Sequence, residues 1–344
     1  MTPEDHALGA LYGLALGDAL GMPTQSFSRG QIQARFGRIT TLENAPADQP
    51  IAPNMPAGSI TDDTEQAILV GQLLVEGKGN IDPHQLARRL ISWESGMRAK
   101  GSQDLLGPST KRAIEMILAG HSPTESGRYG TTNGAAMRIA PVGIASDINQ
   151  PERFIHCVVQ ACQVTHNTSL GIASAAAVAA VISSGINGKK LEHALNAGTE
   201  MAFIAEHQGH WVAGGRMGPR IRWARQASSA CNPDNIGDLL YDVIGTSVAS
   251  QESVVVAFAL AQRVANGAIN SFDALCMAAS IGGDTDTIAA ILGAMLGACG
   301  GLQQWPTALI EQVVKVNDLH LEPLIRELLA LRLASSPCHG LQHD

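Results

Sequence analysis

Aromatic residues are scarce in this 344-residue chain, which has only 6 Phe, 4 Trp and 3 Tyr, and charged residues make up only 16% of it. Since 45% of the residues are hydrophobic, the chain can still bury a large core, and this balance excludes an intrinsically disordered protein. A core with few large rings has to be built from small and aliphatic side chains. The 36 glycines suit such a core, because a residue without a Cβ lets two backbones approach closely.

A surplus of basic residues is also missing. The chain has 23 Lys and Arg against 31 Asp and Glu, which gives a formal net charge of −8. Proteins that bind nucleic acids or anionic lipid surfaces normally present a basic face. We therefore expect neither a nucleic acid nor a membrane as the scaffold on which this protein works.

Targeting signals and thiolate motifs are absent as well. The first residues are acidic, unlike a secretory signal, and the longest apolar stretch, residues 170–182, is interrupted by Ser174 and shorter than the ~18 residues of a membrane span. The six cysteines include no C-x-x-C pair, which argues against a zinc site or a disulfide framework and favours reduced, mostly buried thiols. These features predict a soluble cytoplasmic protein.

Apolar residues recur at three- and four-residue spacing along most of the chain, and no segment alternates cleanly between apolar and polar residues. This pattern predicts an all-α protein. Because no change of composition marks a linker, we expect a single domain over residues 1–344. The predicted helices cover residues 6–20, 64–76, 83–97, 109–119, 152–164, 169–183, 191–207, 236–249, 252–265, 271–280, 287–299 and 306–333, the last with a break near residue 320.

The first predicted helix carries a stripe of small residues. Gly9, Gly13 and Gly17 recur every four residues and so lie on one face of the helix. Such a stripe indicates that the helix packs closely against a neighbour.

Three segments do not follow the helical pattern. Residues 25–59 contain four prolines, and residues 127–134 and 209–219 are rich in glycine. We interpret all three as loops on the surface. Loops of this length inside a compact chain are usually functional.

Two short acidic motifs far apart in the chain resemble each other. The first reads Ser-Ile-Thr-Asp-Asp-Thr at residues 59–64, and the second reads Gly-Gly-Asp-Thr-Asp-Thr at residues 282–287. Carboxylate and hydroxyl oxygens are the ligands that Mg²⁺, Mn²⁺ and Ca²⁺ prefer, and four carboxylates brought together would repel one another without cations. The motifs therefore predict a divalent metal site. Its carboxylates would be Asp62, Asp63, Asp284 and Asp286.

A plainer interpretation of the same motifs is helix capping. Each motif leads from a loop into a predicted helix, and Asp and Thr are preferred at helix N-termini. Two more polar segments have equally plain alternatives. Asn133-Gly134 favours a tight turn, and a histidine such as His166, between two predicted helices, is often a cap or loop residue.

Taken together, these segments resemble the ADP-ribosylglycohydrolase family, whose prototype removes ADP-ribose from an arginine of dinitrogenase reductase. The matching motifs follow the family's order within about residues 7–300. They are residues 9–21 (Gly-Ala-Leu-Tyr-Gly-Leu-Ala-Leu-Gly-Asp-Ala-Leu-Gly), 60–64 (Ile-Thr-Asp-Asp-Thr), 133–138 (Asn-Gly-Ala-Ala-Met-Arg), 165–167 (Thr-His-Asn) and 282–287.

The resemblance implies a compact orthogonal helical bundle with a central cleft that holds two Mg²⁺ or Mn²⁺ ions. It implies hydrolysis of the glycosidic bond of an ADP-ribosyl or related ribosyl group, carried by an ADP-ribosylated protein or a small ribosyl compound, with release of ADP-ribose or ribose. Asp62 and Asp63 would be catalytic, an aspartate accepting the proton of the attacking water. The metal ligands would be Thr61, Asp62, Asp63, Asp284, Asp286 and Thr287. The substrate would contact Gln25, Asn133, Gly134, Met137, His166, Gly282 and Gly283.

Two positions depart from the family's pattern. Gln25 stands where many members have a glutamate, and Gly130 stands where the prototype has an aspartate. A glutamine cannot act as a base or neutralise a cation, so the departures point to a changed substrate, such as a small N-riboside. Asp18 falls inside a predicted helix, and we interpret it as structural.

Two other functions are kept as alternatives. The chain could be a non-catalytic member of the fold that binds ADP-ribose and metal, which the glutamine at position 25 favours and the retained acidic residues oppose. It could also be an unrelated helical metal protein whose aspartates cap helices.

Overall fold

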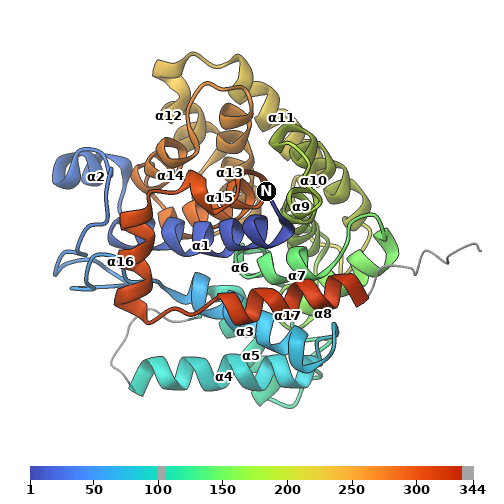
Figure 1. The fold of residues 1–344 in the computed structure, drawn as a ribbon. Coiled ribbons are helices and arrows are strands. Elements are labelled where there is room, and N and C mark those ends of the chain that lie inside the picture. Colours follow the sequence, from blue (N-terminus) through green and yellow to red (C-terminus); the bar gives the residue numbers. More distant parts are fainter. Residues whose placement is uncertain (100–105, 335–344) are drawn as a thin grey trace, which may run out of the picture.

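The computed structural model describes residues 1–99 and 106–334, and it is built from α-helices (Figure 1). Within these residues no β-strand forms, and extended segments pair only at two isolated bridges, Thr132 with Ala249 and Thr168 with His210. The all-α prediction is confirmed.

Most helices follow one another through short connections, and longer segments precede α3 (residues 37–61), α6 (residues 119–133) and α11 (residues 206–216). The first part of the chain forms α1 (Pro3–Gly21), the 3₁₀ turn η1 (Met22–Thr24), α2 (Arg29–Phe36), α3 (Asp62–Glu76), α4 (Pro83–Ala99), α5 (Pro108–Leu118), α6 (Gly134–Met137), α7 (Ala140–Ala145) and α8 (Pro151–His166). The second part forms α9 (Ser169–Ile186), α10 (Leu191–Ala205), α11 (Met217–Ala230), η2 (Pro233–Asn235), α12 (Ile236–Asp238), the π-helix η3 (Leu239–Ile244), α13 (Ser250–Ala265), α14 (Ser271–Ser280), α15 (Thr285–Gly300), η4 (Leu302–Gln304), α16 (Thr307–Asn317) and α17 (Glu322–Ala334).

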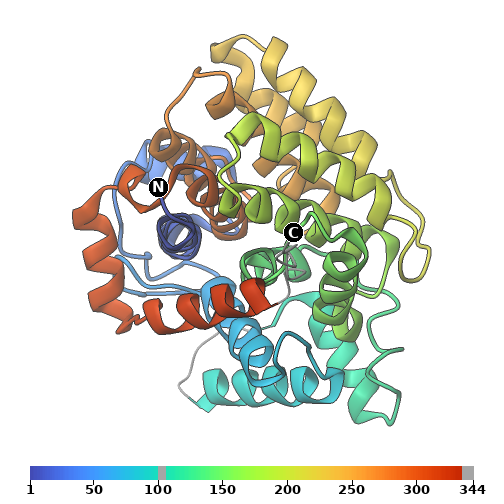
Figure 2. The same cartoon turned by 45° about the vertical axis from the view of Figure 1, so that its right-hand side comes forward.

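Helix α1 lies at the centre of the bundle against α15. In Figure 2 it is seen nearly end-on, with helices from both halves of the chain around it. Its glycine stripe faces α15: a Cβ on Gly13 would lie 2.5 Å from the carbonyl oxygen of Gly293, and one on Gly17 would be still closer to that of Ala289. The prediction of close packing from the glycine spacing is confirmed.

The segment 25–59 is only partly the surface loop that we expected. It contains α2, which begins with a capping box between Ser28 and Gln31. Ile32 and Ile39 are 0% and 1% exposed, so the segment also contributes to the core. The prediction treated residues 25–59 as one proline-rich loop, but the four prolines all follow α2 and do not interrupt it.

Two other expectations about helices were wrong. Helix α11 was missed because its sequence is rich in arginine, and its buried face consists of a few small and aliphatic residues such as Ile221 and Ala224. The helix expected over residues 236–249 ends at Ile244, where Gly245 adopts a positive φ of 90° that other residues rarely accept. The remaining residues up to 249 form a loop.

Helix α9 is the most apolar element of the core. It is 18 residues long with a mean hydropathy of 1.8, so by length and composition it could cross a membrane. However, 94% of it is buried inside the protein, as is typical of the central helix of a soluble domain. The sequence had located this stretch at residues 170–182.

The cysteines of the described residues are free thiols. Three of them, Cys157, Cys162 and Cys276, are buried, and Cys231 and Cys299 are partly exposed. Cys338 lies outside the described residues. The expectation of mostly buried, reduced thiols agrees with this arrangement.

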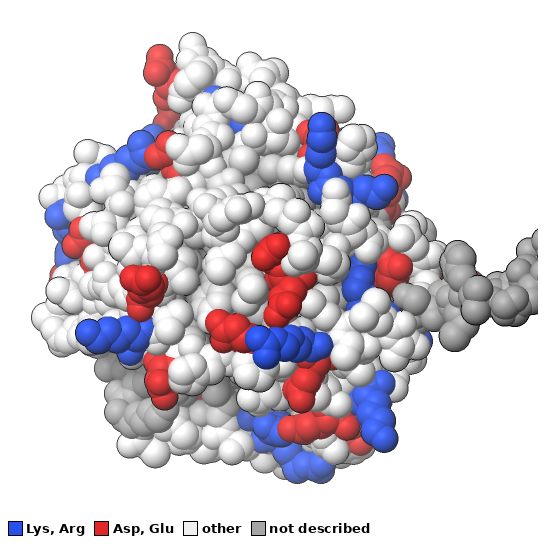
Figure 3. Space-filling model, viewed as in Figure 1, with Lys and Arg blue, Asp and Glu red and all other residues white. Residues whose placement is uncertain are grey.

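The apolar core stabilises the fold more than the surface charges do. On the face shown in Figure 3, acidic and basic side chains are interspersed. Ion pairs such as Arg35 with Asp48, at 2.7 Å, join exposed side chains and so contribute about 0–1 kcal/mol each. Packing of the small-residue core therefore positions the site described next.

Candidate functional site

A cleft with a free volume of about 220 Å³ opens where the first turns of α3, α5, α6 and α15 meet. Both acidic motifs contribute to it. The predicted site residues that line the cleft are Gln25, Asp62, Asn133, Gly134, Met137, Asp284, Asp286 and Thr287. The predicted residues that do not line the cleft are Thr61, Asp63, His166, Gly282 and Gly283.

The first acidic motif forms the N-terminus of α3. Thr61 is its N-cap, and the hydroxyl of Thr61 accepts a hydrogen bond from the backbone N–H of Asp63. The capping interpretation is therefore correct for Thr61. Asp62 follows in the first turn and faces the cleft, whereas Asp63 is 1% exposed and lies behind it.

Asp18 reaches the same helix end from α1. Its carboxylate accepts hydrogen bonds from the backbone N–H of Thr61 at 3.0 Å and from the hydroxyls of Thr61 and Thr64 at 2.7 and 2.5 Å. Burial raises the pKa of Asp18 to about 6, although these bonds oppose the rise. Asp18 thus ties α1 to α3, which agrees with the structural role inferred from the sequence.

The second acidic motif forms the N-terminus of α15. Asp284 occupies the N-cap position but makes no side-chain capping bond. Instead it accepts hydrogen bonds at the cleft, including one from the amide of Asn133 at 2.5 Å. For Asp284 the capping interpretation is wrong, because its side chain makes no hydrogen bond to the backbone N–H groups of the helix end.

Gly282 and Gly283 hold the turn that leads into α15. Both adopt positive φ angles, 92° and 80°. The backbone of Gly283 pairs with the neighbouring loop in both directions: its N–H donates to the carbonyl of Phe27, and its carbonyl accepts from the N–H of Ser26 at 2.7 Å. A Cβ on Gly282 would meet the backbone of Arg29. The pair therefore lets neighbouring loops pack closely, and a direct contact with substrate stays a prediction.

The carboxylates of the cleft interact electrostatically. Burial raises the pKa of Asp63 well above its usual value, and the negative charge of Asp286 and of the neighbouring aspartates raises it further. Burial also raises the pKa of Asp284 to about 6, although the hydrogen bond from Asn133 lowers it. One oxygen of Asp63, Oδ1, is buried without a hydrogen-bond partner. This is a concentration of negative charge that requires protons or cations to be stable.

A complete metal cage is not formed by the side chains as they stand. Among residues 1–99 and 106–334, no three Asp, Glu, His or Cys side chains converge on one ion position. Mg²⁺ is commonly held by only one or two carboxylates together with waters and substrate oxygens. The dinuclear centre expected from the sequence therefore stays a prediction.

A buried chain of hydrogen bonds orients Asp62 from behind. The amide of Gln66 donates to Asp62 at 2.8 Å, and Arg138 donates to Gln66 at 3.0 Å. Arg138 also donates to Thr165, which bonds the Nδ1 of His166 at 2.7 Å. Arg138 is completely buried, so its charge and Asp62 act on each other through a medium with little water.

His166 supports the cleft from below. It is fully buried at the end of α8, and its Nε2 bonds the hydroxyl of Thr132, which lines the cleft, at 2.9 Å. Burial and the nearby Arg138 lower the pKa of His166 well below its usual value, so the ring is neutral at pH 7. Gly134 packs over this ring, and a Cβ on Gly134 would lie only 3.0 Å from Cε1 of His166.

Gly130 does not widen the cleft. A Cβ at this position would collide with the backbone carbonyl of Thr165 in α8, and the carbonyl of Gly130 accepts a hydrogen bond from Thr168 at 2.6 Å. A glycine is needed here because the loop lies directly on the helix. The expectation that this departure alters the substrate pocket is not supported by its position.

Several cleft residues were missed by sequence reasoning. They lie outside the two acidic motifs and come from three separate loops and the start of α5, so no shared local pattern marks them. They are Ser26, Ile51, Leu106, Gly107, Pro108, Thr110, Lys111, Thr132 and Val248.

Comparisons with known proteins agree with this arrangement. The sequence model of the ADP-ribosylglycohydrolase family matches residues 1–337. The chain belongs to the ADP-ribosylglycohydrolase family. This is a family of hydrolases, so the interpretation as an unrelated helical metal protein is excluded.

Relatives of the family match along nearly the whole chain. An uncharacterized protein of Escherichia coli, YegU, is 33% identical over 92% of this chain and 93% of its own. The ADP-ribosyl-[dinitrogen reductase] glycohydrolase of Rhodospirillum rubrum is 24% identical over 95% of this chain and 97% of its own. A solved ADP-ribosylglycohydrolase-related protein complex has the same fold, with a TM-score of 0.68, 23% identity and coverage of 97% and 99% of the two chains.

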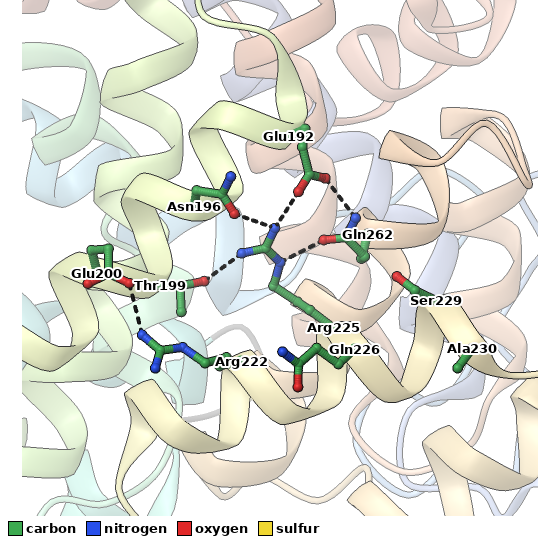
Figure 4. A pocket seen from close by; sticks show the side chains of 10 residues that line it. All are labelled: Glu192, Asn196, Thr199, Glu200, Arg222, Arg225, Gln226, Ser229, Ala230 and Gln262. Carbon is green, nitrogen blue, oxygen red and sulfur yellow. Dashed lines mark hydrogen bonds and ion pairs between the residues drawn. The ribbon is translucent and has the colours of Figure 1, made fainter.

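A second, larger cavity of about 650 Å³ lies between α10, α11 and α13, away from the acidic motifs of this ADP-ribosylglycohydrolase-family chain. Figure 4 shows that its polar side chains bond one another. Arg225 points between the helices and donates to Gln262 at 2.7 Å, to Thr199 at 2.8 Å and to Asn196 at 2.9 Å. It also pairs with Glu192 at 3.1 Å. The network connects three helices, which indicates a structural role.

We expect Arg225→Met to lower the free energy of unfolding by about 2–3 kcal/mol, because it leaves four polar partners without their donor. Turnover should not change. Urea unfolding measures the loss. The matched control is Arg222→Met on the same helix, since Arg222 is 52% exposed and pairs with an exposed glutamate. Equal losses from the two variants would contradict the assigned role.

Proposed function

We propose that this protein is a divalent-metal-dependent hydrolase that cleaves the glycosidic bond of an ADP-ribosyl or related ribosyl group and releases ADP-ribose or ribose. The observation that carries the proposal is that two distant acidic motifs face one cleft in a chain of this hydrolase family. The name of the Rhodospirillum rubrum relative, which specifies an ADP-ribosyl protein, supports the substrate class. We infer that the reaction takes place in the cytoplasm.

The residues of the cleft fit a divalent cation by three criteria. Their donors are carboxylate and hydroxyl oxygens, which suit Mg²⁺ and Mn²⁺. Oδ1 of Asp63 is buried without a partner, and burial together with the clustered negative charges raises the pKa of that carboxyl. We infer that two ions are held. Their ligands would be Thr61, Asp62, Asp63, Asp284, Asp286 and Thr287.

Each residue has a part that follows from its position. When bound, the cations supply Lewis-acid chemistry and neutralise the carboxylates. Asp62 faces the cleft, and its Oδ2 accepts a hydrogen bond from Gln66. We therefore assign to Asp62 the role of the base that accepts the proton of the attacking water. Asp63 lies behind the lining and balances charge. Asn133 fixes Asp284, and the buried His166 fixes Thr132 at the wall where the ribosyl group would lie.

A small N-riboside is a second candidate substrate. The free volume of about 220 Å³ is below the roughly 300–1,000 Å³ usual for small-molecule sites. The non-catalytic alternative is favoured by Gln25, which lines the cleft but cannot exchange a proton. It is opposed by the complete acidic set around the same cleft.

The proposal is tested by incubating the purified protein with ADP-ribosyl-arginine, ADP-ribosyl-serine, an ADP-ribosylated protein and simple N-ribosides, each with Mg²⁺, with Mn²⁺ and with a chelator. We expect metal-dependent release of ADP-ribose or ribose from at least one of them, measured by chromatography. Absence of product from the whole panel, with ADP-ribose still bound, would favour the binding protein. Release of product that persists in the chelator would contradict the proposed dependence on a divalent metal.

The raised pKa values of Asp63 and Asp284 predict how pH changes stability. A carboxyl whose pKa is raised on folding keeps a proton that the unfolded chain has released, so Asp284 makes the metal-free protein less stable as pH rises from about 4 through about 6. The raised pKa of Asp63 acts in the same direction. Cations bind the ionised form and reverse this loss. We therefore expect saturating Mg²⁺ to stabilise the protein by about 3 kcal/mol at pH 7.5.

Saturating Mg²⁺ at pH 5 should stabilise the protein much less than at pH 7.5, because protons compete with the cation for the carboxylates. Thermal unfolding with Mg²⁺ and with a chelator at both values of pH measures the difference. Asp284→Asn is the matched control, and it should reduce the dependence on pH. A stabilisation of equal size at pH 5 and 7.5 would refute the linkage.

A further inference from the structure

Gln25 lines the cleft, and the nitrogen of its side-chain amide has no hydrogen-bond partner in the protein. The residue follows η1, and only 6% of it is exposed. It lines the cleft together with Asp62 and Asp286, yet its Nε2 is buried without a hydrogen-bond partner. An unpaired buried donor destabilises the free protein, so a protein retains one where something else supplies the acceptor.

The backbone around Gln25 is held firmly in place. Its N–H donates to the carbonyl of Gly21 at 3.1 Å, and its carbonyl accepts from the amide of Gln49 at 2.9 Å. The next residue, Ser26, has a positive φ of 64° and donates to the carbonyl of Gly283 at 2.7 Å. A serine in this conformation is strained, and such strain persists only where the surroundings enforce it. The amide is therefore positioned before any ligand arrives.

We propose that Gln25 is a specificity-determining residue, whose Nε2–H donates a hydrogen bond to an oxygen of the ribosyl substrate. The inference rests on the proposed function and adds to it how this chain recognises its substrate. An N–H donor is repelled by cations and attracted by hydroxyl, carbonyl or phosphate oxygens, so its partner is the substrate and not a metal ion. An amide does not exchange protons near pH 7, so Gln25 binds and orients without acting as acid or base.

The proposal separates stability from binding. In the free protein the unpaired amide is a cost, so Gln25→Met, which has similar length and no polar atom, should leave the melting temperature unchanged or raise it. In the complex the amide is paired. The same variant should therefore bind ADP-ribose about tenfold more weakly, the loss typical of one hydrogen bond to a buried group.

The experiment is calorimetric titration of the full-length protein with ADP-ribose in the presence of Mg²⁺, and separately with Mg²⁺ alone. We expect Gln25→Met to weaken ADP-ribose binding about tenfold while Mg²⁺ binding stays unchanged. Gln25→Glu keeps the shape but replaces the donor by a carboxylate, so it should also weaken ADP-ribose. It should tighten Mg²⁺ binding by adding a negative charge beside Asp62 and Asp286. Gln226→Met, at an exposed glutamine, is the matched control.

Three results would overturn the proposal. Unchanged ADP-ribose binding in Gln25→Met would show that the amide does not contact the substrate. Weaker Mg²⁺ binding in that variant would show that the amide oxygen holds the metal instead. A lower melting temperature would assign Gln25 to the fold. If the wild-type protein itself neither binds ADP-ribose nor releases it from any compound of the panel, the proposed function fails first, and this inference fails with it.

Discussion

Asp286→Asn is expected to lower turnover at least about a thousandfold. Asp286 lies in the first turn of α15, is 2% exposed and lines the cleft beside Asp62. Asparagine has the same shape but no charge, so it weakens the binding of a divalent cation. The loss should therefore appear both in the rate of ADP-ribose release and in Mg²⁺ affinity measured by calorimetry.

The stability of Asp286→Asn shows whether a loss of turnover comes from a damaged metal site or from unfolding of the protein. The negative charge of Asp286 raises the pKa of Asp63, so the two carboxylates repel each other. Removing one charge should leave the chelated protein at least as stable as wild type. The matched control is Asp318→Asn, at a side chain that is 93% exposed and in the left-handed conformation that asparagine accepts. Full activity in Asp286→Asn would remove this residue from the proposed site.

Gly17→Ala should lower the free energy of unfolding by about 3 kcal/mol or more. Gly17 belongs to the stripe on α1 that lies directly on the carbonyl groups of α15, and a Cβ has no space there. The helices would have to move apart. The displacement reaches the site, because the adjacent Asp18 bonds the N-terminus of α3, so Mg²⁺ binding should weaken as well.

A second glycine shows whether the effect depends on packing. Gly96 lies inside α4, and a Cβ built there meets no atom within 4 Å. Gly96→Ala should stabilise the protein by about 0.5–1 kcal/mol, since alanine is the better helix former. Urea unfolding of both variants gives the comparison. If Gly17→Ala were as stable as Gly96→Ala, the close approach of α1 and α15 would be wrong.

The sequence was informative where a local pattern has one physical cause. The spacing of apolar residues predicted most of the helices, and the glycine spacing predicted the packed face of α1. The oxygen-rich chemistry of the two acidic motifs pointed to residues that do meet at one cleft. Where the pattern was weak, as in the arginine-rich α11, the prediction failed, because burial of a few small residues leaves little periodic signal.

Which side chains face the cleft could not be read from the sequence. Successive residues of a helix are about 100° apart around its axis, so Asp62 and Asp63 are expected to point in different directions, but only the structure shows that Asp62 faces the cleft and that Asp63 is buried. Gly130 looked like a change in the substrate pocket, but it packs on the backbone of α8. His166 is fully buried and bonds Thr132, a contact that its sequence neighbours do not indicate, and its contact with substrate stays a prediction.

The sequence by itself determined the all-helical class, the family and the kinds of atoms available to the site, because these follow from residue types and their spacing along one chain. The tertiary structure decided which of those atoms share a cleft, because proximity between distant residues depends on packing. The contact between the glycine face of α1 and α15 brings the start of α15 beside the start of α3. The tertiary structure also places Gln25 in the lining of the cleft with its amide nitrogen unpaired, which no local sequence pattern could indicate.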